Sequence, residues 1–241
     1  MGVIVEGQSL HISRQFNNEL EHIKNHLLEM GGLVESQVSG AIKAIMDADS
    51  QLAINVRDAD KRINQMEVDI DEECTRIIAQ RQPAASDLRF VISVIKVVTD
   101  LERIGDESAK IARQAIKLCE EGEAPRGYVE IRHIGGRVQR MTQESLTAFA
   151  RLDIDAALAV AQEDTSVDRE YESAMRELVT YMMEDPASIK RVMNIIWSLR
   201  ALERIGDHAR NIAESVIYIV KGKDVRHISV DELASRVNAS I

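Results

Sequence analysis

LERIGD, at residues 101–106, is the most informative stretch of this sequence, because the same six letters return at residues 202–207. The similarity continues beyond the hexapeptide: residues 101–112 read LERIGDESAKIA, and residues 202–213 read LERIGDHARNIA. Six identical residues are improbable by chance in a chain of 241. We therefore interpret the sequence as an internal duplication.

Placed on a helix, each copy separates an apolar stripe from a pair of carboxylates. At about 100° per residue, Glu102 and Asp106 lie about 40° apart, one turn from each other. The opposite side carries the residues that must be buried, which are Val97, Leu101, Ile104, Ile111, Ala115 and Leu118 in the first copy and Leu202, Ile205, Ala209, Ile212, Val216 and Ile219 in the second. We expect the acids, including Glu203 and Asp207, to point away from the core.

The composition indicates an all-α protein, since proline occurs only three times and no alternating Val, Ile and Thr segments predict strands. A formal charge of −10 disfavours nucleic acid as a partner. The N-terminus does not read as a signal peptide, and no apolar run approaches the ~18 residues needed to span a bilayer. We expect a cytoplasmic protein without membrane insertion, with Cys74 and Cys119 as free thiols.

Helical periodicity and breakers predict six helices, three in each half. Their approximate ranges are 13–45, 51–80, 84–120, 128–150, from the turn at 153–155 to 184, and 187–221, with a possible short helix at 231–237. The adjacent Gly31 and Gly32 predict a kink or a close helix crossing. Breakers concentrate at 122–127, so we predict two domains, 1–122 and 123–241, each an antiparallel three-helix bundle.

The helix before each LERIGD segment also carries a row of oxygen-bearing side chains beside its apolar stripe. If neighbouring helices bring these rows together, two clusters form. The first acid cluster comprises Asp60, Asn64, Glu67, Glu102 and Asp106, and the second acid cluster comprises Asp164, Asp168, Glu203 and Asp207. Carboxylates at i and i+4 repel each other. A bound ion would resolve the repulsion, and oxygen ligands suit Mg²⁺, Mn²⁺, Fe or Zn²⁺.

Other interpretations compete with metal binding. The acids could be solvated and neutralised by Arg103, Arg204 or Arg210, leaving a metal-free helical scaffold. A metal-dependent enzyme or oxidase is the alternative function, since exposed carboxylate-bound Fe or Mn keeps open coordination positions. The pairs Glu19-x-x-His22 and Glu130-x-x-His133 have the spacing of di-iron bundles, but they lie on other helices than the acid rows. His208 is expected to be exposed. No phosphate-binding loop or catalytic triad pattern is present, which favours a non-enzymatic adaptor.

The paired LERIGD segments, together with QPAASDLR at 82–89 and NIAE at 211–214, closely resemble the PhoU family of bacterial phosphate transport accessory proteins. The resemblance implies two pseudo-symmetric three-helix bundles, a homodimer, and multinuclear metal clusters on paired (Glu/Asp)-x-x-x-Asp motifs. It also implies a cytoplasmic negative regulator of the phosphate-starvation response, acting between the phosphate ABC transporter ATPase PstB and the sensor histidine kinase PhoR. By motif match, the ligands would be Glu102 and Asp106 with Asp60, and Glu203 and Asp207 with Asp164 and Asp168. Asn64 departs from the acidic pattern, which weakens the expected metal affinity of the first cluster.

Overall fold

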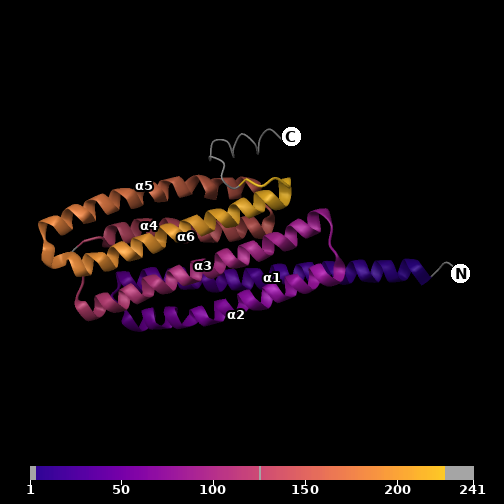
Figure 1. The fold of residues 1–241 in the computed structure, drawn as a ribbon, viewed down its shortest axis with the longest axis horizontal. Helices are drawn as coiled ribbons and strands as arrows, with labels where there is room; N and C mark the ends of the chain where they lie inside the picture. Colours follow the sequence, from indigo (N-terminus) through magenta and orange to yellow (C-terminus); the bar gives the residue numbers. More distant parts are fainter. Residues whose placement is uncertain (1–3, 125, 226–241) are drawn as a thin grey trace.

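A computed structural model describes residues 4–124 and 126–225, and this part of the chain is built from long α-helices without strands (Figure 1). A short 3₁₀ turn, Pro186–Ser188, precedes the last helix. The helices are α1 (Ile4–Met46), α2 (Ser50–Arg81), α3 (Ala85–Glu121), α4 (Tyr128–Arg151), α5 (Ile154–Glu184) and α6 (Ile189–Lys221). The all-α prediction is therefore confirmed. Among the described residues, no helix has a stretch apolar and long enough to cross a membrane.

The helices form two antiparallel bundles, α1–α3 and α4–α6, which lie side by side along their length (Figure 1). Their closest association is between α3 and α6, the two helices that carry LERIGD, and α1 also packs on α4. The order of helices in one half repeats in the other, so the duplication in sequence is a duplication in structure.

The helix ends follow from local chemistry and repeat between the halves. Asp49 caps α2 by accepting a hydrogen bond from the backbone N–H of Leu52, and Asp153 caps α5 through Ala156 in the same way. The first helix is longer than predicted, because it begins at Ile4 and not near Ser13. Only one breaker, Gly7, lies in the added turns, and a single helical glycine costs only about 1 kcal/mol. The expected helix at 231–237 lies outside the described residues.

A pair of small residues explains how α1 and α4 approach each other. A Cβ at Gly31 of α1 would lie 2.8 Å from a methyl group of Leu146 on α4, and a Cβ at Gly135 of α4 would lie 3.2 Å from Ile42 on α1. Gly135 lies 104 residues after Gly31, and Leu146 lies 104 residues after Ile42. The two contacts are therefore equivalent under the duplication, and the crossing is pseudo-symmetric. The close-crossing interpretation of Gly31 is confirmed, and α1 continues through Gly31-Gly32 as one helix.

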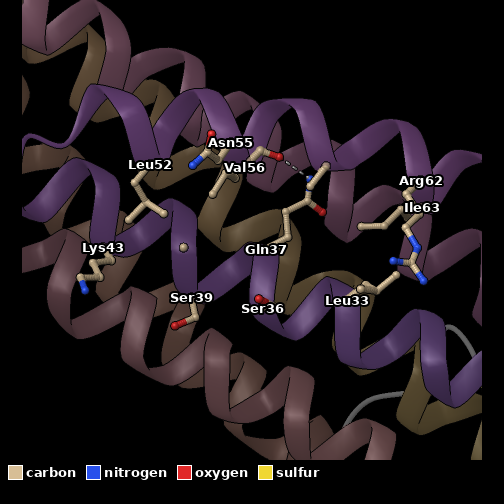
Figure 2. A pocket seen from close by; sticks show the side chains of 12 residues that line it. Leu33, Ser36, Gln37, Ser39, Lys43, Leu52, Asn55, Val56, Arg62 and Ile63 are labelled. Atoms are coloured by element: carbon tan, nitrogen blue, oxygen red, sulfur yellow. Dashed lines mark hydrogen bonds between the residues drawn. The ribbon is translucent and has the colours of Figure 1, made fainter.

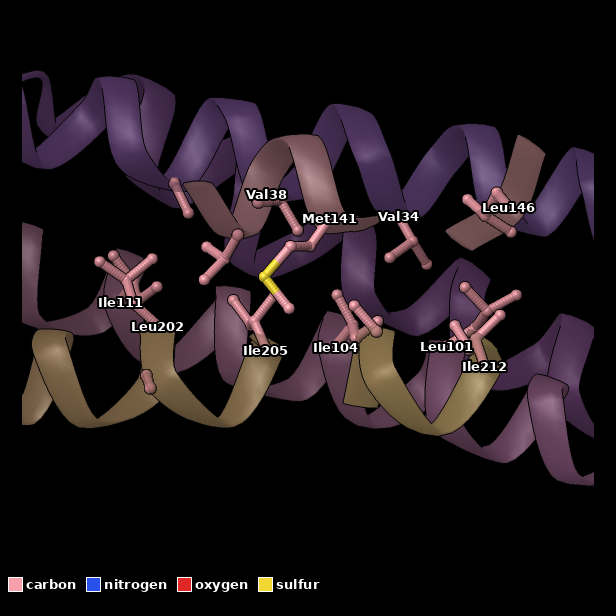
Figure 3. Close-up of a cluster of buried hydrophobic side chains, with 14 of the residues drawn as sticks. Val34, Val38, Leu101, Ile104, Ile111, Met141, Leu146, Leu202, Ile205 and Ile212 are labelled. Carbon is pink, nitrogen blue, oxygen red and sulfur yellow. The ribbon is translucent and has the colours of Figure 1, made fainter. Parts of the chain in front are cut away.

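The hydrophobic core runs through both bundles as one cluster. Every residue of the two predicted LERIGD stripes is buried. Figure 3 shows the centre of this core, where Val34 of α1, Leu101 of α3, Met141 of α4 and Ile205 of α6 meet. Because the bundles share apolar contacts, the division into domains 1–122 and 123–241 stays a prediction.

Candidate metal centre

The second acid cluster lies in the groove between α5 and α6. Asp164 on α5 is only 1% exposed, while Glu203 on α6 is partly buried. Gly206 of the second LERIGD segment faces Asp164, and a Cβ there would sit 3.4 Å from Asp164 Oδ1. An added Cβ would therefore make only an ordinary van der Waals contact with this carboxylate, and the Asp164 side chain lies directly against the backbone of α6. Asp168 and Asp207 lie at the exposed rim of the groove.

The carboxylates of the second cluster are close enough to affect one another's protonation. Burial raises the pKa of Glu203 to about 7, with further contributions from Asp207, Asp168 and Asp164. Burial and Asp168 raise the pKa of Asp164 to about 6. The pKa of Asp207 is also raised, by loss of surrounding water and then by Asp168. The groove therefore concentrates negative charge that a proton or a cation would relieve.

The first acid cluster occupies the equivalent groove between α2 and α3. Burial raises the pKa of Asp60, and Asp106 raises it further. Burial likewise raises the pKa of Glu102, with contributions from Asp106 and Asp60, and that of Glu67, with contributions from Glu102 and Asp106. The structure therefore brings these four predicted carboxylates together. Asn64 is exposed, and its side chain opposes the rise in the pKa of Asp60.

Gln37 of α1 completes the first cluster and was not predicted from the sequence. Its Nε2 atom donates to the Val56 carbonyl at 3.2 Å (Figure 2). The same atom donates to Asp60 Oδ1 at 3.4 Å. A Cβ at Gly105 would lie 3.1 Å from Gln37 Oε1 and 3.3 Å from Asp60 Oδ1, so a side chain at this position would crowd both polar groups, more closely than one at Gly206 would crowd Asp164. The signal was present, because Gln37 is a polar residue inside the apolar stripe of α1.

A groove between α1 and α2 adjoins this cluster (Figure 2). It has a volume of about 560 Å³ and reaches from Leu52 at one end to Arg62 at the other, with Gln37 in its wall. At Gly40 the helices are too close for a side chain, since a Cβ would lie 2.8 Å from Val56. Gln37 is therefore the residue that connects the groove with the first acid cluster.

Asp164, which was expected in a row beside the apolar stripe of its helix, is buried almost completely. Its side chain lies between α5 and α6, where Arg210 pairs with Asp164 Oδ2 at 3.3 Å and with Glu214 at 2.9 Å. Other arginines reach the clusters from the rim, namely Arg200 at 2.7 Å from Glu203 and Arg103 at 3.5 Å from Glu102. The arginine pairing considered for these acids thus exists, but it satisfies only part of their oxygens.

Several buried oxygens of the clusters have no hydrogen-bond partner among the described residues. They are Asp164 Oδ1, Glu203 Oε2 and Gln37 Oε1. Buried acceptors without partners are costly, and a bound cation would satisfy them. The donor set of carboxylate and amide oxygens fits a hard or borderline cation. In the described residues, however, no three acid-cluster ligand atoms lie within 4.8 Å of one another, so closing around an ion requires side-chain rotation.

Two histidine expectations also change. His208 is only 16% exposed, because its Nδ1 lies 2.9 Å from Asp100 Oδ1 on α3, so the expectation of an exposed side chain is wrong. Burial by the neighbouring bundle was not visible in the periodicity of one helix. Glu19 of the proposed di-iron pair is held by Arg81 through contacts of 2.6 and 2.9 Å, and His22 lies near Glu73 instead.

Comparisons with known proteins identify a family. The family model described as "PhoU domain" matches residues 27–115 and 131–216, one segment in each bundle. A phosphate-specific transport system accessory protein PhoU homolog of Pseudomonas aeruginosa is 68% identical over 94% of each chain, and PhoU of Escherichia coli K12 is 48% identical over 92% of each.

Solved structures give the same result at the level of the fold. The crystal structure of PhoU from Pseudomonas aeruginosa is similar with a TM-score of 0.85 and 69% identity, covering 86% of this chain and 100% of that one. The phosphate transport system regulatory protein PhoU from Streptococcus pneumoniae has a TM-score of 0.80 at 32% identity, covering 87% and 99%. The duplicated helices, the twin LERIGD segments and these similarities together show that this chain belongs to the PhoU family.

Proposed function

We propose that this protein is a non-enzymatic, cytoplasmic regulator of phosphate uptake and of the phosphate-starvation response. It acts between the ATPase PstB of the phosphate ABC transporter and the sensor histidine kinase PhoR, and lowers the output of both. Membership of a family whose relatives are named accessory proteins of phosphate-specific transport supports the link to transport. The observation that carries the proposal is the pair of equivalent acid clusters on a rigid helical framework, one in each half of a shared core.

Metal ions are the natural occupants of the acid clusters in this proposal. Glu203, Asp207 and Asp168 with Asp164 would hold one group of ions, and Glu102, Asp106 and Glu67 with Asp60 the other. A bound divalent or trivalent ion such as Mg²⁺, Mn²⁺, Zn²⁺ or Fe supplies positive charge where the carboxylates repel one another. The orphaned Asp164 Oδ1 and Glu203 Oε2 support this occupancy.

The positions of the carboxylates in the two acid clusters determine how a bound ion would affect the protein. One acid cluster lies between α2 and α3 and the other between α5 and α6. Neutralising their carboxylates therefore removes repulsion between neighbouring helices. Asp207 and Asp168 at the rim keep the second cluster accessible to a partner protein. Because Glu203 has a pKa of about 7, part of its population is protonated at neutral pH, and a cation binding there displaces that proton.

Binding of purified full-length protein to the two partners tests the proposal. The wild-type chain should bind the transporter ATPase and the cytoplasmic part of the kinase, and Glu203→Gln/Asp207→Asn should weaken at least one of these interactions about tenfold or more. Glu172→Gln is the matched control, because Glu172 is an exposed acid on α5 outside the clusters. Wild-type protein that binds neither partner, with or without metal, would contradict the adaptor role.

Oxygen uptake tests the enzymatic alternative. The proposal expects the iron-loaded protein to consume no oxygen catalytically, while a carboxylate-bridged oxidase would turn over and lose activity in Glu203→Gln.

The proposal also includes a homodimer, which light scattering of the purified chain would measure directly.

A further inference from the structure

A different kind of ligand set lies on the first bundle, between α1 and α2 at a second cleft that is separate from the groove in Figure 2. His22 and His26 are one turn apart on α1, and Glu73 of α2 faces both. Glu73 Oε1 lies 3.5 Å from His22 Nε2 and 3.4 Å from His26 Nδ1. Within the described residues, this is the one group of three or more His, Cys, Asp or Glu ligand atoms that all lie within 4.8 Å of one another.

The spacing of these atoms matches that of ligands around a small tetrahedral ion. Zinc–nitrogen and zinc–oxygen bonds of about 2.0–2.2 Å place neighbouring ligands about 3.3–3.6 Å apart. Both nitrogen-to-oxygen distances at Glu73 fall in that range. Two imidazoles and one carboxylate also form a donor set that zinc uses in proteins.

Hydrogen bonding does not account for the arrangement. His26 Nδ1 is buried and has no hydrogen-bond partner among the described residues, although Glu73 Oε1 is near. The other carboxylate oxygen, Glu73 Oε2, is also buried without a partner. An ion bound between these facing side chains would satisfy both unpartnered polar atoms.

The surroundings limit the protein ligands to these three. Cys74, next to Glu73 in sequence, is fully buried in the hydrophobic core, and its sulfur is not part of the group of ligand atoms that lie within 4.8 Å of one another. Glu19 is bound by Arg81. A cleft of about 220 Å³ opens beside His22 and Glu73, which leaves space for a water molecule as the fourth ligand.

The second bundle shows that the ligand set is specific to the first. A shift of 104 residues, which relates Gly31 to Gly135 and Asp60 to Asp164, relates His22 to Arg126 and Glu73 to Glu177. Arg126 and Glu177 line a common cleft between the chain entering α4 and helix α5. The same shift relates His26 to Glu130, so the second bundle has an arginine and a glutamate where the first has two histidines.

We propose that His22 Nε2, His26 Nδ1 and the Glu73 carboxylate bind one Zn²⁺ ion, or a similar borderline divalent ion, with water in the fourth position. The site is separate from the acid clusters. It lies at the cleft beside His22 and Glu73 between α1 and α2, whereas the acid clusters lie between α2 and α3 and between α5 and α6. The ion ties α1 to α2 in the first bundle only.

Histidine-selective NMR of the full-length chain tests this site without interference from the acid clusters. The probe is Zn²⁺ itself, titrated into ¹⁵N-histidine-labelled protein with excess Mg²⁺ present to occupy oxygen ligands. We expect the His22 and His26 imidazole nitrogens to show metal coordination at one equivalent, and His133 on α4 to remain unchanged.

His22→Gln provides the decisive variant, because this side chain is 67% exposed and its replacement leaves the core intact. It should lower the Zn²⁺ affinity of the site by more than about 100-fold, beyond the 10–100-fold cost of losing an outer-shell partner. His133→Gln, which changes an exposed histidine outside the cluster, should bind Zn²⁺ like the wild type. Unchanged His22 and His26 signals at saturating Zn²⁺, or equal affinities for His22→Gln and wild type, would overturn the proposal.

Discussion

At the scale of single residues, the two acid clusters differ in charge although their framework is the same. Asn64 in the first cluster corresponds to Asp168 in the second, and the second cluster has Arg210 in contact with Asp164. The first cluster instead uses the uncharged Gln37. Equivalent backbones thus present different electrostatic environments to a cation.

Substitutions at the equivalent positions 64 and 168 should change the metal affinities of the two acid clusters in opposite directions. Asn64→Asp adds a carboxylate to the first cluster and should raise its Mn²⁺ affinity about tenfold, since ligand charge count tunes affinity at oxygen sites. Asp168→Asn should lower the affinity of the second cluster by a similar factor. Isothermal titration calorimetry of both variants measures this. Identical affinities in all three proteins would show that position 64/168 does not contact the ion.

The raised pKa of Glu203 predicts a pH-dependent stability for the metal-free protein. An unfolded Glu loses its proton near pH 4.5, whereas the folded Glu203 has a pKa of about 7, so folding free energy is lost as pH rises between these values. Glu203→Gln should therefore stabilise the protein by about 1–3 kcal/mol at about pH 8 and by little below about pH 4.5.

Urea unfolding with a chelator present measures this difference at each pH. The control is Glu172→Gln, which removes an exposed carboxylate outside the acid clusters and should change the free energy of unfolding by no more than about 1 kcal/mol. A Glu203→Gln effect that does not change with pH would mean that the folded-state pKa of Glu203 is not raised.

At the scale of the helices, most of the arrangement could be predicted from the sequence. The LERIGD stripes, the caps at Asp49 and Asp153 and the break at 122–127 each follow from local patterns. The burial of Asp164 and His208 could not be predicted, because it depends on which neighbouring helix covers each face. The position of Gln37 in the apolar stripe of α1 indicates its burial, but its pairing with Asp60 could not be predicted for the same reason.

The crossing of α1 and α4 makes a prediction about its glycines. Gly32 is exposed with nothing within 4 Å of an added Cβ, so Gly32→Ala should stabilise the protein by about 0.5–1 kcal/mol through helix propensity. Gly31→Ala gains the same propensity but places its methyl 2.8 Å from Leu146, so it should be less stable than Gly32→Ala by about 1–3 kcal/mol. Thermal or chemical denaturation of the pair measures the difference. Equal stabilities would show that α1 and α4 do not approach closely.

At the scale of the whole molecule, the shared core predicts that the two bundles unfold together. Leu202 of α6 is fully buried where α6 meets α3, so Leu202→Ala should cost about 2–5 kcal/mol. Hydrogen exchange should then show reduced protection in α3 and α2 as well as in α4–α6. Loss of protection confined to α4–α6 would instead support two independent domains at 1–122 and 123–241.

The central prediction for the whole molecule is that each LERIGD segment builds a cation site with the helix before it. Anomalous scattering from crystals of the metal-loaded protein, recorded on both sides of the absorption edge of the bound metal, tests this most directly. We predict anomalous peaks beside Glu102 and Asp106 and beside Glu203 and Asp207, with the second pair lost in Glu203→Gln/Asp207→Asn crystals. Metal-loaded crystals without a peak at either segment would contradict it.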